Sequence, residues 1–284
     1  PILGAGSSMA DYRIGFKWWA LIIAVVFVIS ELVCVACVPE RPVACDEKPG
    51  KISDMFKALF KNDQAMTVVV SIILVYTSLN ICGNLVLYFF RFDVGNEGAY
   101  SIFAAVAFAA QVIVMMVIPL LRKRFSKSRL FISGFIIQIA GFAVILIMAF
   151  AKLYTPQSWY ILCLPGILIY LGYGMLNVIM TIFLSDSVDY GEVMNGTREE
   201  SVIFSMQTFT VKLASGVAVF LAGLVVDWIH LDAAAAVQTQ DTLDALRMWM
   251  TIPSVILLIV GIFVFKRFYK LDDARMEEIK SKLN

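Results

Sequence analysis

The sequence has 284 residues, of which 60% are hydrophobic and only 16% charged, and its mean hydropathy is +0.83. Globular domains are roughly 45–50% apolar and about 25% charged, so this composition excludes a water-soluble enzyme, and an aromatic content of 13% excludes a disordered chain. A net charge of +1 also argues against a nucleic-acid-binding protein, which needs basic residues gathered on one face.

Several apolar runs are long enough to cross a bilayer, whose core of about 30 Å needs roughly 20 residues of helix. Alternation with period two is absent and lipid cannot satisfy an open backbone, so helices are expected. The predicted fold class is all-α, a polytopic membrane helical bundle with about seven transmembrane helices. In chain order the predicted spans are 18–38, 66–90, 99–121, 130–151, 159–185, 201–228 and 249–265.

The first span contains Cys34 and Cys37 at C-x-x-C spacing, without a second pair that would complete a metal site. We interpret them as small apolar residues, with a redox or metal pair as the alternative, and we expect no metal. The chain begins at Pro1 with residues typical of a loop. An odd number of spans after such a start is expected for a piece of a longer membrane protein.

Lys and Arg are distributed unevenly between the segments that join the spans. Seventeen of the 23 fall in 39–65, 122–129, 186–200 and 266–284, five fall in the opposite set, and one lies within a span. Cytoplasmic loops carry the excess of basic residues, so the first set is predicted to be cytoplasmic and the start of this chain to lie outside. Residues 39–65 also place apolar side chains at helical spacing beside lysines, which predicts an amphipathic helix at the membrane surface.

Polar side chains recur at steps of four along the second span, at Tyr76, Asn80, Asn84 and Tyr88. They share one helix face. Amide and phenol groups facing a water-filled cleft would suit a ligand rich in hydroxyl groups. Hydrogen bonding between packed helices is an equally weighted alternative.

The middle spans contain small and polar residues that suggest close helix packing. Gly172 and Gly174 allow neighbouring helices to approach closely or bend. Gln111 and Gln138 are single polar residues that we expect to bond between helices. Pro253 is predicted to lie near the start of the last span, where proline is tolerated.

An acidic segment follows the fifth span, although positive charge is expected on that side. Asp186, Asp189 and Glu192 are at steps of three, and Arg198 follows after a glycine. These charges suggest a gate that closes the cytoplasmic face in one state by pairing with basic groups elsewhere. A solvated acidic loop is the alternative.

Lys212 lies within the sixth span, too deep to reach the headgroups comfortably. An ionisable group in a membrane span is a functional candidate, because placing its charge there costs about 2.5–3.5 kcal/mol. Ser201, Ser205, Thr208 and Ser215 lie on the same helical face. The stripe predicts the wall of a polar cavity, while the alternative is a lysine buried in a structural ion pair.

Three stretches resemble the glycoside-pentoside-hexuronide:cation symporters, a group of the major facilitator superfamily that includes melibiose permease. They are Pro39-Glu40-Arg41, the run from Asp186 to Glu192 with Arg198, and Ser205-Met-Gln-Thr-Phe-Thr-Val-Lys212. The resemblance implies the major facilitator fold and cation-coupled symport of a sugar or glycoside by alternating access between two halves. It implies a transporter, not an enzyme, in the plasma membrane (bacterial inner membrane).

The resemblance also implies a division of the chain into four parts. Residues 1–38 would form an outer loop and the last helix of the N-terminal half, 39–65 the central cytoplasmic loop, 66–268 the C-terminal six-helix bundle, and 269–284 a solvated cytoplasmic tail. On this resemblance the first five helices of the family would lie outside the chain. No cofactor is expected. The partners would be the sugar or glycoside, the lipid bilayer, the missing N-terminal helices, and a monovalent cation, Na⁺ or H⁺, bound mainly by the missing half.

Carried over by position, Lys212 resembles the family's helix-eleven lysine near sugar and cation, with Gln207, Thr208 and Val211 facing the same cavity. Tyr173 or Asn177 stands where melibiose permease has an aromatic residue in helix ten. The resemblance assigns the cytoplasmic charge network to residues Asp186, Asp189, Glu192 and Arg198. A lysolipid carrier of the same fold, which would need a lateral apolar opening, and a non-transporting sensor or scaffold are the alternative functions.

Overall fold

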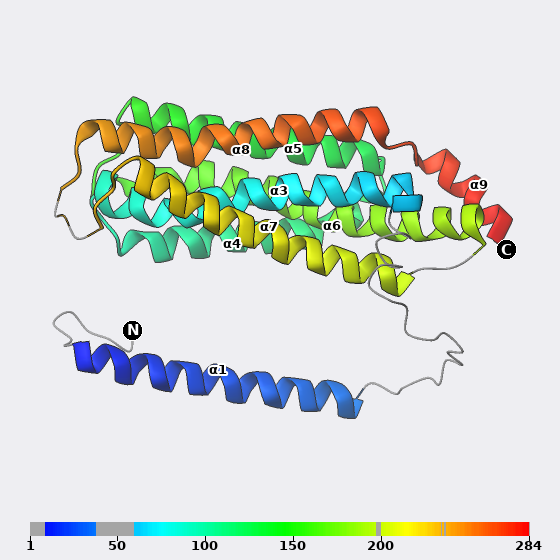
Figure 1. The fold of residues 1–284 in the computed structure, drawn as a ribbon, viewed down its shortest axis with the longest axis horizontal. Coiled ribbons are helices and arrows are strands. Elements are labelled where there is room, and N and C mark those ends of the chain that lie inside the picture. Colours follow the sequence, from blue (N-terminus) through cyan, green and yellow to red (C-terminus); the bar gives the residue numbers. More distant parts are fainter. Residues whose placement is uncertain (1–8, 38–59, 197–199, 234, 236, 284) are drawn as a thin grey trace. The chain divides into compact units, whose positions relative to one another are not determined.

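The computed structural model describes residues 9–37, 60–196, 200–233, 235 and 237–283. The chain divides into two units, Pro1–Gly50 and Lys51–Asn284. Among the described residues every regular element is helical, and seven helices are long and apolar enough to cross a membrane (Figure 1). The predicted all-α membrane fold is therefore confirmed.

The first unit contributes helix α1, Met9–Cys37, which begins nine residues before the first predicted span, 18–38, and covers that span as far as Cys37. Its membrane-length run, Ile14–Cys37, has a mean hydropathy of 2.8. Cys34 and Cys37 are free thiols. Most of the predicted amphipathic helix in 39–65 and the Pro39-Glu40-Arg41 stretch lie outside the described residues.

The second unit is a bundle of long helices with a short terminal helix (Figure 1). In chain order its elements are α3 (Asp63–Tyr88), the π-helical turn η1 (Phe89–Asp93), α4 (Ala99–Arg122), α5 (Lys127–Phe150), the short turn η2 (Trp159–Leu162), α6 (Cys163–Asn195), α7 (Glu200–Trp228), α8 (Gln240–Phe268) and α9 (Asp273–Leu283). We call the two ends of this bundle the Asp93 end and the Asp186 end. The chain reaches α9 at the Asp186 end.

Helices α3 and α6 form the centre of the second unit. Helix α3 packs against α6, α7 and α8, while α6 packs against α4 and α5, and α5 also contacts α8. The core side chains are mostly aliphatic, with aromatic clusters toward both ends. Near the Asp186 end Phe131 of α5, Phe183 of α6 and Phe265 of α8 meet with ring centroids 4.5–5.2 Å apart.

Close helix approach at the paired glycines of α6 is confirmed. A Cβ built on Gly172 would lie 2.6 Å from the carbonyl oxygen of Gly134 on α5, and one built on Gly174 would lie 2.6 Å from Val114 on α4. These contacts are too short for any larger residue, so the two glycines seat α6 against two different neighbours.

The expectation that Gln138 bonds between helices is wrong. Its side chain is fully buried against the Gly172 contact, and neither amide atom has a hydrogen-bond partner among the described residues. Serines make that kind of bond instead: the hydroxyls of Ser78 on α3 and Ser254 on α8 donate to each other's carbonyl oxygens at 3.1 and 2.8 Å.

Two predicted span boundaries in the second unit differ from the structure by nine or more residues. Helix α6 continues ten residues past its predicted end and stops at Gly196, whose φ of 73° suits a glycine cap. Helix α8 begins nine residues before its predicted start, with Thr239 as its N-cap, so Pro253 lies well inside the helix. Each extension contains a charged residue that is buried in an ion pair, Asp186 in α6 and Arg247 in α8.

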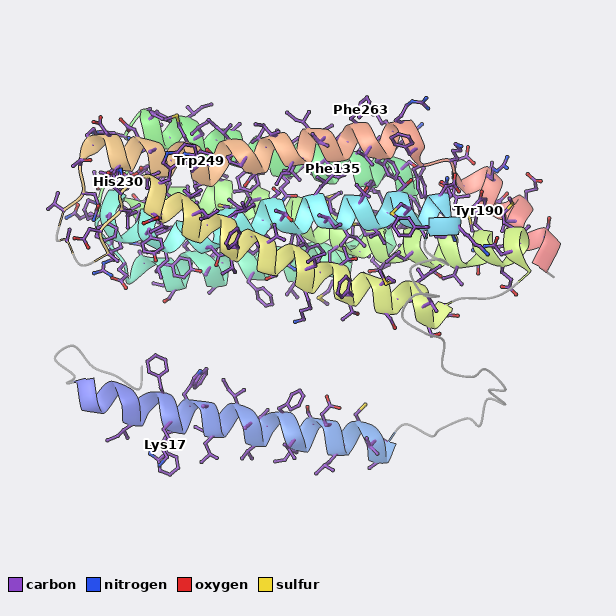
Figure 2. All side chains as sticks on the ribbon, viewed as in Figure 1. Lys17, Phe135, Tyr190, His230, Trp249 and Phe263 are labelled. Atoms are coloured by element: carbon purple, nitrogen blue, oxygen red, sulfur yellow. The ribbon has the colours of Figure 1, made fainter. Side chains whose placement is uncertain are left out.

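The predicted solvated tail is solvated on one face only. Helix α9 buries Met276 and Ile279, together with Leu271 before it, against Tyr190 and Val193 of α6. Figure 2 shows Tyr190 at this end of the bundle. Leu271 and α9 are thus packed onto the end of α6.

We expect Gly172→Ala to destabilise the protein by about 1–3 kcal/mol, because the added methyl group would overlap α5. Gly223→Ala on α7 is the matched control, since a Cβ there meets nothing within 4 Å and alanine is the better helix former. Thermal unfolding of both variants in detergent measures the difference. Equal midpoints would contradict the close approach of α5 and α6.

Candidate functional site

A polar cluster joins α3 and α6 in the middle of the second unit. The side-chain amide of Asn177 donates a hydrogen bond of 2.6 Å to the hydroxyl oxygen of Tyr76, and the rings of Tyr76 and Tyr173 meet edge to face with centroids 5.5 Å apart. Tyr173 is 9% exposed, whereas Tyr76 and Asn177 are half-buried. The phenol hydroxyl of Tyr76 and the side-chain amide of Asn177 bring both donor and acceptor groups to the cluster.

The asparagines of α3 bond to their own helix. The amide of Asn80 donates to the carbonyl oxygen of Tyr76 and the amide of Asn84 donates to that of Asn80, each at 2.7 Å. Both side chains are half-buried. Within the predicted polar stripe of α3, Tyr76 therefore contacts another helix, whereas Asn80 and Asn84 bond to backbone carbonyls of α3 itself.

The polar stripe on α7 lies on the outside of the second unit. Lys212 and Thr208 are exposed, whereas Gln207 and Val211 are half-buried and Val211 packs against the core. Lys212 makes no ion pair with any residue that the structure describes. The alternative interpretation, that Lys212 is buried in a structural ion pair, therefore finds no support in the described part of the chain.

A buried ion pair anchors the acidic segment at the Asp186 end. Asp186 of α6 pairs with Lys127 at the start of α5, and the side chains are 8% and 5% exposed. Asp273 of α9 lies 3.6 Å from both Lys127 and Arg122. Burial, together with the nearby carboxylates of Asp186 and Asp273, raises the pKa of Tyr269 above its ordinary value, so this phenol stays protonated.

The other predicted gate residues are placed less completely. Asp189 and Glu192 are half-buried on the last turns of α6 and both take part in polar interactions. Arg198 lies outside the described residues. The interpretation as a solvated loop does not hold for Asp186, which is buried and belongs to a helix.

The start of α3 is tied to the same end of the bundle. Asn62 caps α3 by accepting from the amide of Ala65, and its own amide donates 2.7 Å to the carbonyl oxygen of Ser187 on α6. The side-chain oxygen of Gln64 accepts from the backbone amide of Lys270 at 2.8 Å. These bonds join three segments that are far apart in sequence.

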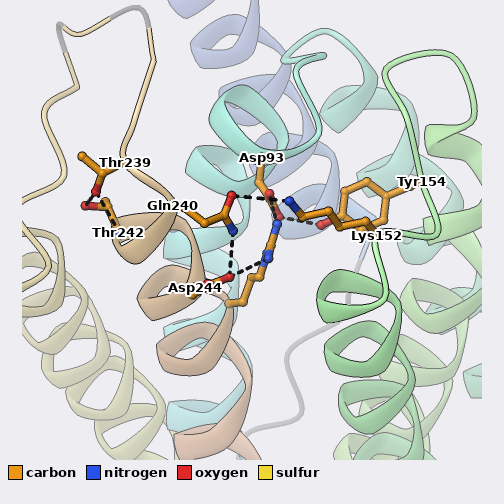
Figure 3. A network of polar contacts seen from close by, with 8 residues as sticks. Asp93, Lys152, Tyr154, Thr239, Gln240, Thr242 and Asp244 are labelled. Atoms are coloured by element: carbon orange, nitrogen blue, oxygen red, sulfur yellow. Dashed lines mark hydrogen bonds and ion pairs between the residues drawn. The ribbon is translucent and has the colours of Figure 1, made fainter.

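A second buried ion pair, which the sequence analysis missed, lies at the Asp93 end (Figure 3). Arg247 of α8 binds Asp93 through two nitrogens, with Nε 2.9 Å from Oδ2, and both side chains are 3% exposed. Arg247 also donates to Asp244 at 2.7 Å, and the hydroxyl of Tyr154 donates to Asp93 at 2.5 Å. Burial, followed by the Asp93 carboxylate, raises the pKa of Tyr154 above its ordinary value.

One sequence signal pointed to this cluster. Asp244 and Arg247 are three residues apart, a spacing at which opposite charges pair on one helix face. The spacing indicates that α8 starts before its apolar run. Asp93 gave no such signal, because its partner is 154 residues away.

The described residues contain no group of three or more His, Cys, Asp or Glu side chains that could hold a metal ion. The polar features are instead a central uncharged cluster, an exposed lysine stripe, and a buried ion pair at each end. This arrangement offers hydrogen bonds to a hydroxyl-rich ligand near the middle of the helices.

Comparison with known proteins identifies one matching family, described as MFS/sugar transport protein, over residues 1–273. The chain is 24% identical to the raffinose carrier protein of Pediococcus pentosaceus over 98% of this chain and 43% of that protein. It is 26% identical to the isoprimeverose transporter of Lactiplantibacillus pentosus, over 95% and 54%, and 22% identical to the lactose permease of Lactobacillus helveticus, over 94% and 42%. The chain spans about half the length of the curated relatives it matches.

We expect Arg247→Met to destabilise the protein by roughly 3–5 kcal/mol, because it leaves the Asp93 carboxylate buried without its cation. Arg91→Met is the control, since Arg91 and Glu97 are 44% and 57% exposed and such pairs contribute at most about 1 kcal/mol. Unfolding in detergent measures both, and Asp93→Asn should restore part of the loss in the Arg247→Met background. A loss no larger than that of Arg91→Met would show that the buried pair is not needed.

Proposed function

The chain belongs to the MFS/sugar transport protein family, and from that premise we propose that it is part of a cation-coupled symporter that moves a sugar or glycoside by alternating access. The family consists of membrane transporters and not of enzymes. The family match over residues 1–273 carries the proposal. The resemblance of residues 186–212 predicts the same family and is confirmed.

The chain's length relative to its relatives supports a two-part transporter. About half of each relative lies outside the matched region. In the proposed assembly the second unit supplies the C-terminal six helices, α1 is the last helix of the N-terminal half, and helices beyond this sequence complete the cavity. Alternating access is then a rocking of one half against the other around a central site.

We propose that the sugar contacts the cluster of Tyr76, Tyr173 and Asn177, with Asn80 and Asn84 on the same wall. The half-buried Tyr76 and Asn177 bring a phenol hydroxyl and a side-chain amide, and the Tyr76 and Tyr173 rings supply an apolar face. Uncharged hydrogen-bonding groups beside aromatic rings suit sugars, which combine hydroxyl groups with apolar C–H faces. The relatives named for raffinose, isoprimeverose and lactose support a sugar or glycoside ligand.

Lys212 would couple the sugar to the cation. An exposed lysine on a membrane helix needs water or an opposing carboxylate, and the proposed missing half would supply both across the cavity. Gln207, Thr208 and Val211 would lie beside it. Coupling of about 1–3 kcal/mol between cation and sugar binding must act in both directions, and the coupling cation would be Na⁺ or H⁺.

The Asp186 end would be the cytoplasmic gate. Asp189, Glu192 and Arg198 would pair with basic groups of the other half in the outward-facing state. The buried pair of Asp186 with Lys127 holds the end of α6 in place, so the gate would move with the rigid bundle. The uneven distribution of Lys and Arg supports a location of this end and of the C-terminus in the cytoplasm of a bacterial cell.

One observation favours a second candidate, a carrier of lysolipids. A groove of about 700 Å³ between α3, α7 and α8 is lined almost wholly by apolar side chains, among them Ile73, Leu221 and Trp249. A lysolipid carrier needs an apolar opening of this kind. Its lining offers no hydrogen-bonding pair like that of Tyr76 and Asn177.

Transport by the complete protein in proteoliposomes tests the proposal. We expect uptake of labelled sugar that rises with an inward Na⁺ or H⁺ gradient and is competed by other sugars. Competition by lysophospholipids but not by sugars would favour the second candidate. Absence of any gradient-driven flux would favour a sensor or scaffold.

We expect Lys212→Ala to abolish sugar accumulation against a gradient while leaving membrane insertion intact, because the variant cannot sense the cation. Lys123→Ala, an exposed lysine between α4 and α5, should accumulate sugar normally. Uptake assays with immunoblots of the membrane fraction compare the two. Normal accumulation by Lys212→Ala would remove this residue from the site.

We expect Asn177→Leu to weaken sugar binding about tenfold, as expected for the loss of roughly 1.4 kcal/mol of hydrogen bonding. Tyr76→Phe should add little in the Asn177→Leu background, because the two side chains form one hydrogen-bonded pair. Thr181→Val, one turn further along α6, is the control, because the Thr181 hydroxyl donates to a carbonyl oxygen of its own helix. Fully additive losses in sugar titrations would show that the two residues act separately.

A further inference from the structure

A groove opens between the start of α3 and the end of α8, apart from the central polar cluster. Its volume is about 410 Å³, which is within the range of small-ligand sites. The lining residues are Phe60, Asp63, Met66, Thr67, Val70, Val264, Phe268 and Lys270. One face of α3 and one turn of α8 form its walls.

The groove is apolar along the helices and charged at its mouth. Met66, Val70 and Val264 line the inner part. Lys270 at the mouth is 71% exposed, and its Nζ lies 3.9 Å from the carboxylate of Asp63, which is 57% exposed. A pair this long and this exposed holds Lys270 only weakly.

Two further cations flank the mouth. The guanidinium of Arg267 lies 5.6 Å from the ring centroid of Phe268, which lines the groove. Lys61 is exposed just before α3 begins. Lys270 lines the groove and Lys61 and Arg267 are next to lining residues in sequence, so three basic residues lie in or beside the lining, which contains one carboxylate, that of Asp63.

The groove crosses the boundary between the apolar core and the headgroup region. The apolar run of α8 ends at Phe265 and is followed at once by Lys266 and Arg267. Lysine and arginine at helix ends extend toward the headgroups while their stems stay against apolar surface. An occupant must therefore be apolar at one end and negatively charged at the other.

We propose that this groove binds an anionic phospholipid of the leaflet at the Asp186 end. One acyl chain lies along Met66, Val70 and Val264, and the headgroup phosphate is held by Lys270 and Arg267 with Lys61 nearby. Basic pockets between membrane helices bind anionic headgroups through this charge complementarity. This proposal does not rest on the proposed transport function, since the groove is lined by residues that belong neither to the proposed sugar site nor to the proposed gate.

The headgroup arm of the test compares phosphatidylglycerol with phosphatidylcholine of identical acyl chains. The complete protein is titrated with each lipid and the bound lipid is counted by native mass spectrometry. We expect phosphatidylglycerol to bind more tightly, and the double variant Arg267→Gln with Lys270→Gln to bind it roughly 25-fold more weakly, at about fivefold per lost charge near the membrane.

A matched double variant separates the groove from general surface charge. Lys266→Gln with Lys280→Gln removes the same charge from exposed positions that do not line the groove. It should bind phosphatidylglycerol within about twofold of the unchanged protein. Equal weakening by the two double variants, or no preference for phosphatidylglycerol, would overturn the proposal.

The acyl-chain arm fills the groove without changing charge. Val264→Trp should weaken phosphatidylglycerol binding at least fivefold, whereas Ile259→Trp, at a 54% exposed site on α8 outside the groove, should not. Thermal midpoints confirm that each variant is folded. Full binding by folded Val264→Trp would show that the lipid is not in the groove. Retention of no lipid of either class would indicate that a protein segment covers the groove. Either result would overturn the proposal.

Discussion

Buried charges that must be paired shape both ends of the six-helix unit. A lone charge in a water-free interior costs several kcal/mol, and an ion pair lowers that cost only when its geometry is good and its remaining hydrogen bonds are made. Asp93 meets this condition with two bonds from Arg247 and one from Tyr154. At the opposite end Lys127 lies between Asp186 and Asp273. Each arrangement joins helices that are distant in sequence, so the pairs fix how the helices are placed.

The paired ends and the glycine contacts hold the helices of the second unit together, as the half of the proposed transporter would need. Gly172 and Gly174 hold α6 against α5 and α4, while the bonds of Asn62 and Gln64 hold the start of α3 against α6 and α8. The central cluster of Tyr76 and Asn177 lies between α3 and α6, the two most buried spans. Rocking of a rigid half moves such a cluster as one body, which is what alternating access requires.

The sequence predicted more about the spans than about the site. It predicted the exposed stripe on α7 and the acidic face of α6, because helical periodicity places those residues on one face. Lys127 and Arg247 each lie beside an apolar run, which predicts a loop position for both. The sequence does not reveal their partners, because these are 59 and 154 residues away. Gln138 was expected to bond and finds no partner in the part of the chain that the structure describes, since whether a buried amide finds a partner depends on the facing helix.

The sequence by itself determined the membrane environment, the number of long helices, their approximate bounds and the family, because each depends on local composition, on the length of apolar runs or on short motifs. Only the tertiary structure decided which charges are buried and paired, where α6 ends and α8 begins, and that α9 packs onto α6. Those outcomes depend on which side chains meet across the bundle. In the sequence, a charged residue marks the end of an apolar run. In the fold, the helix can continue through that residue when an opposite charge on another helix pairs with it.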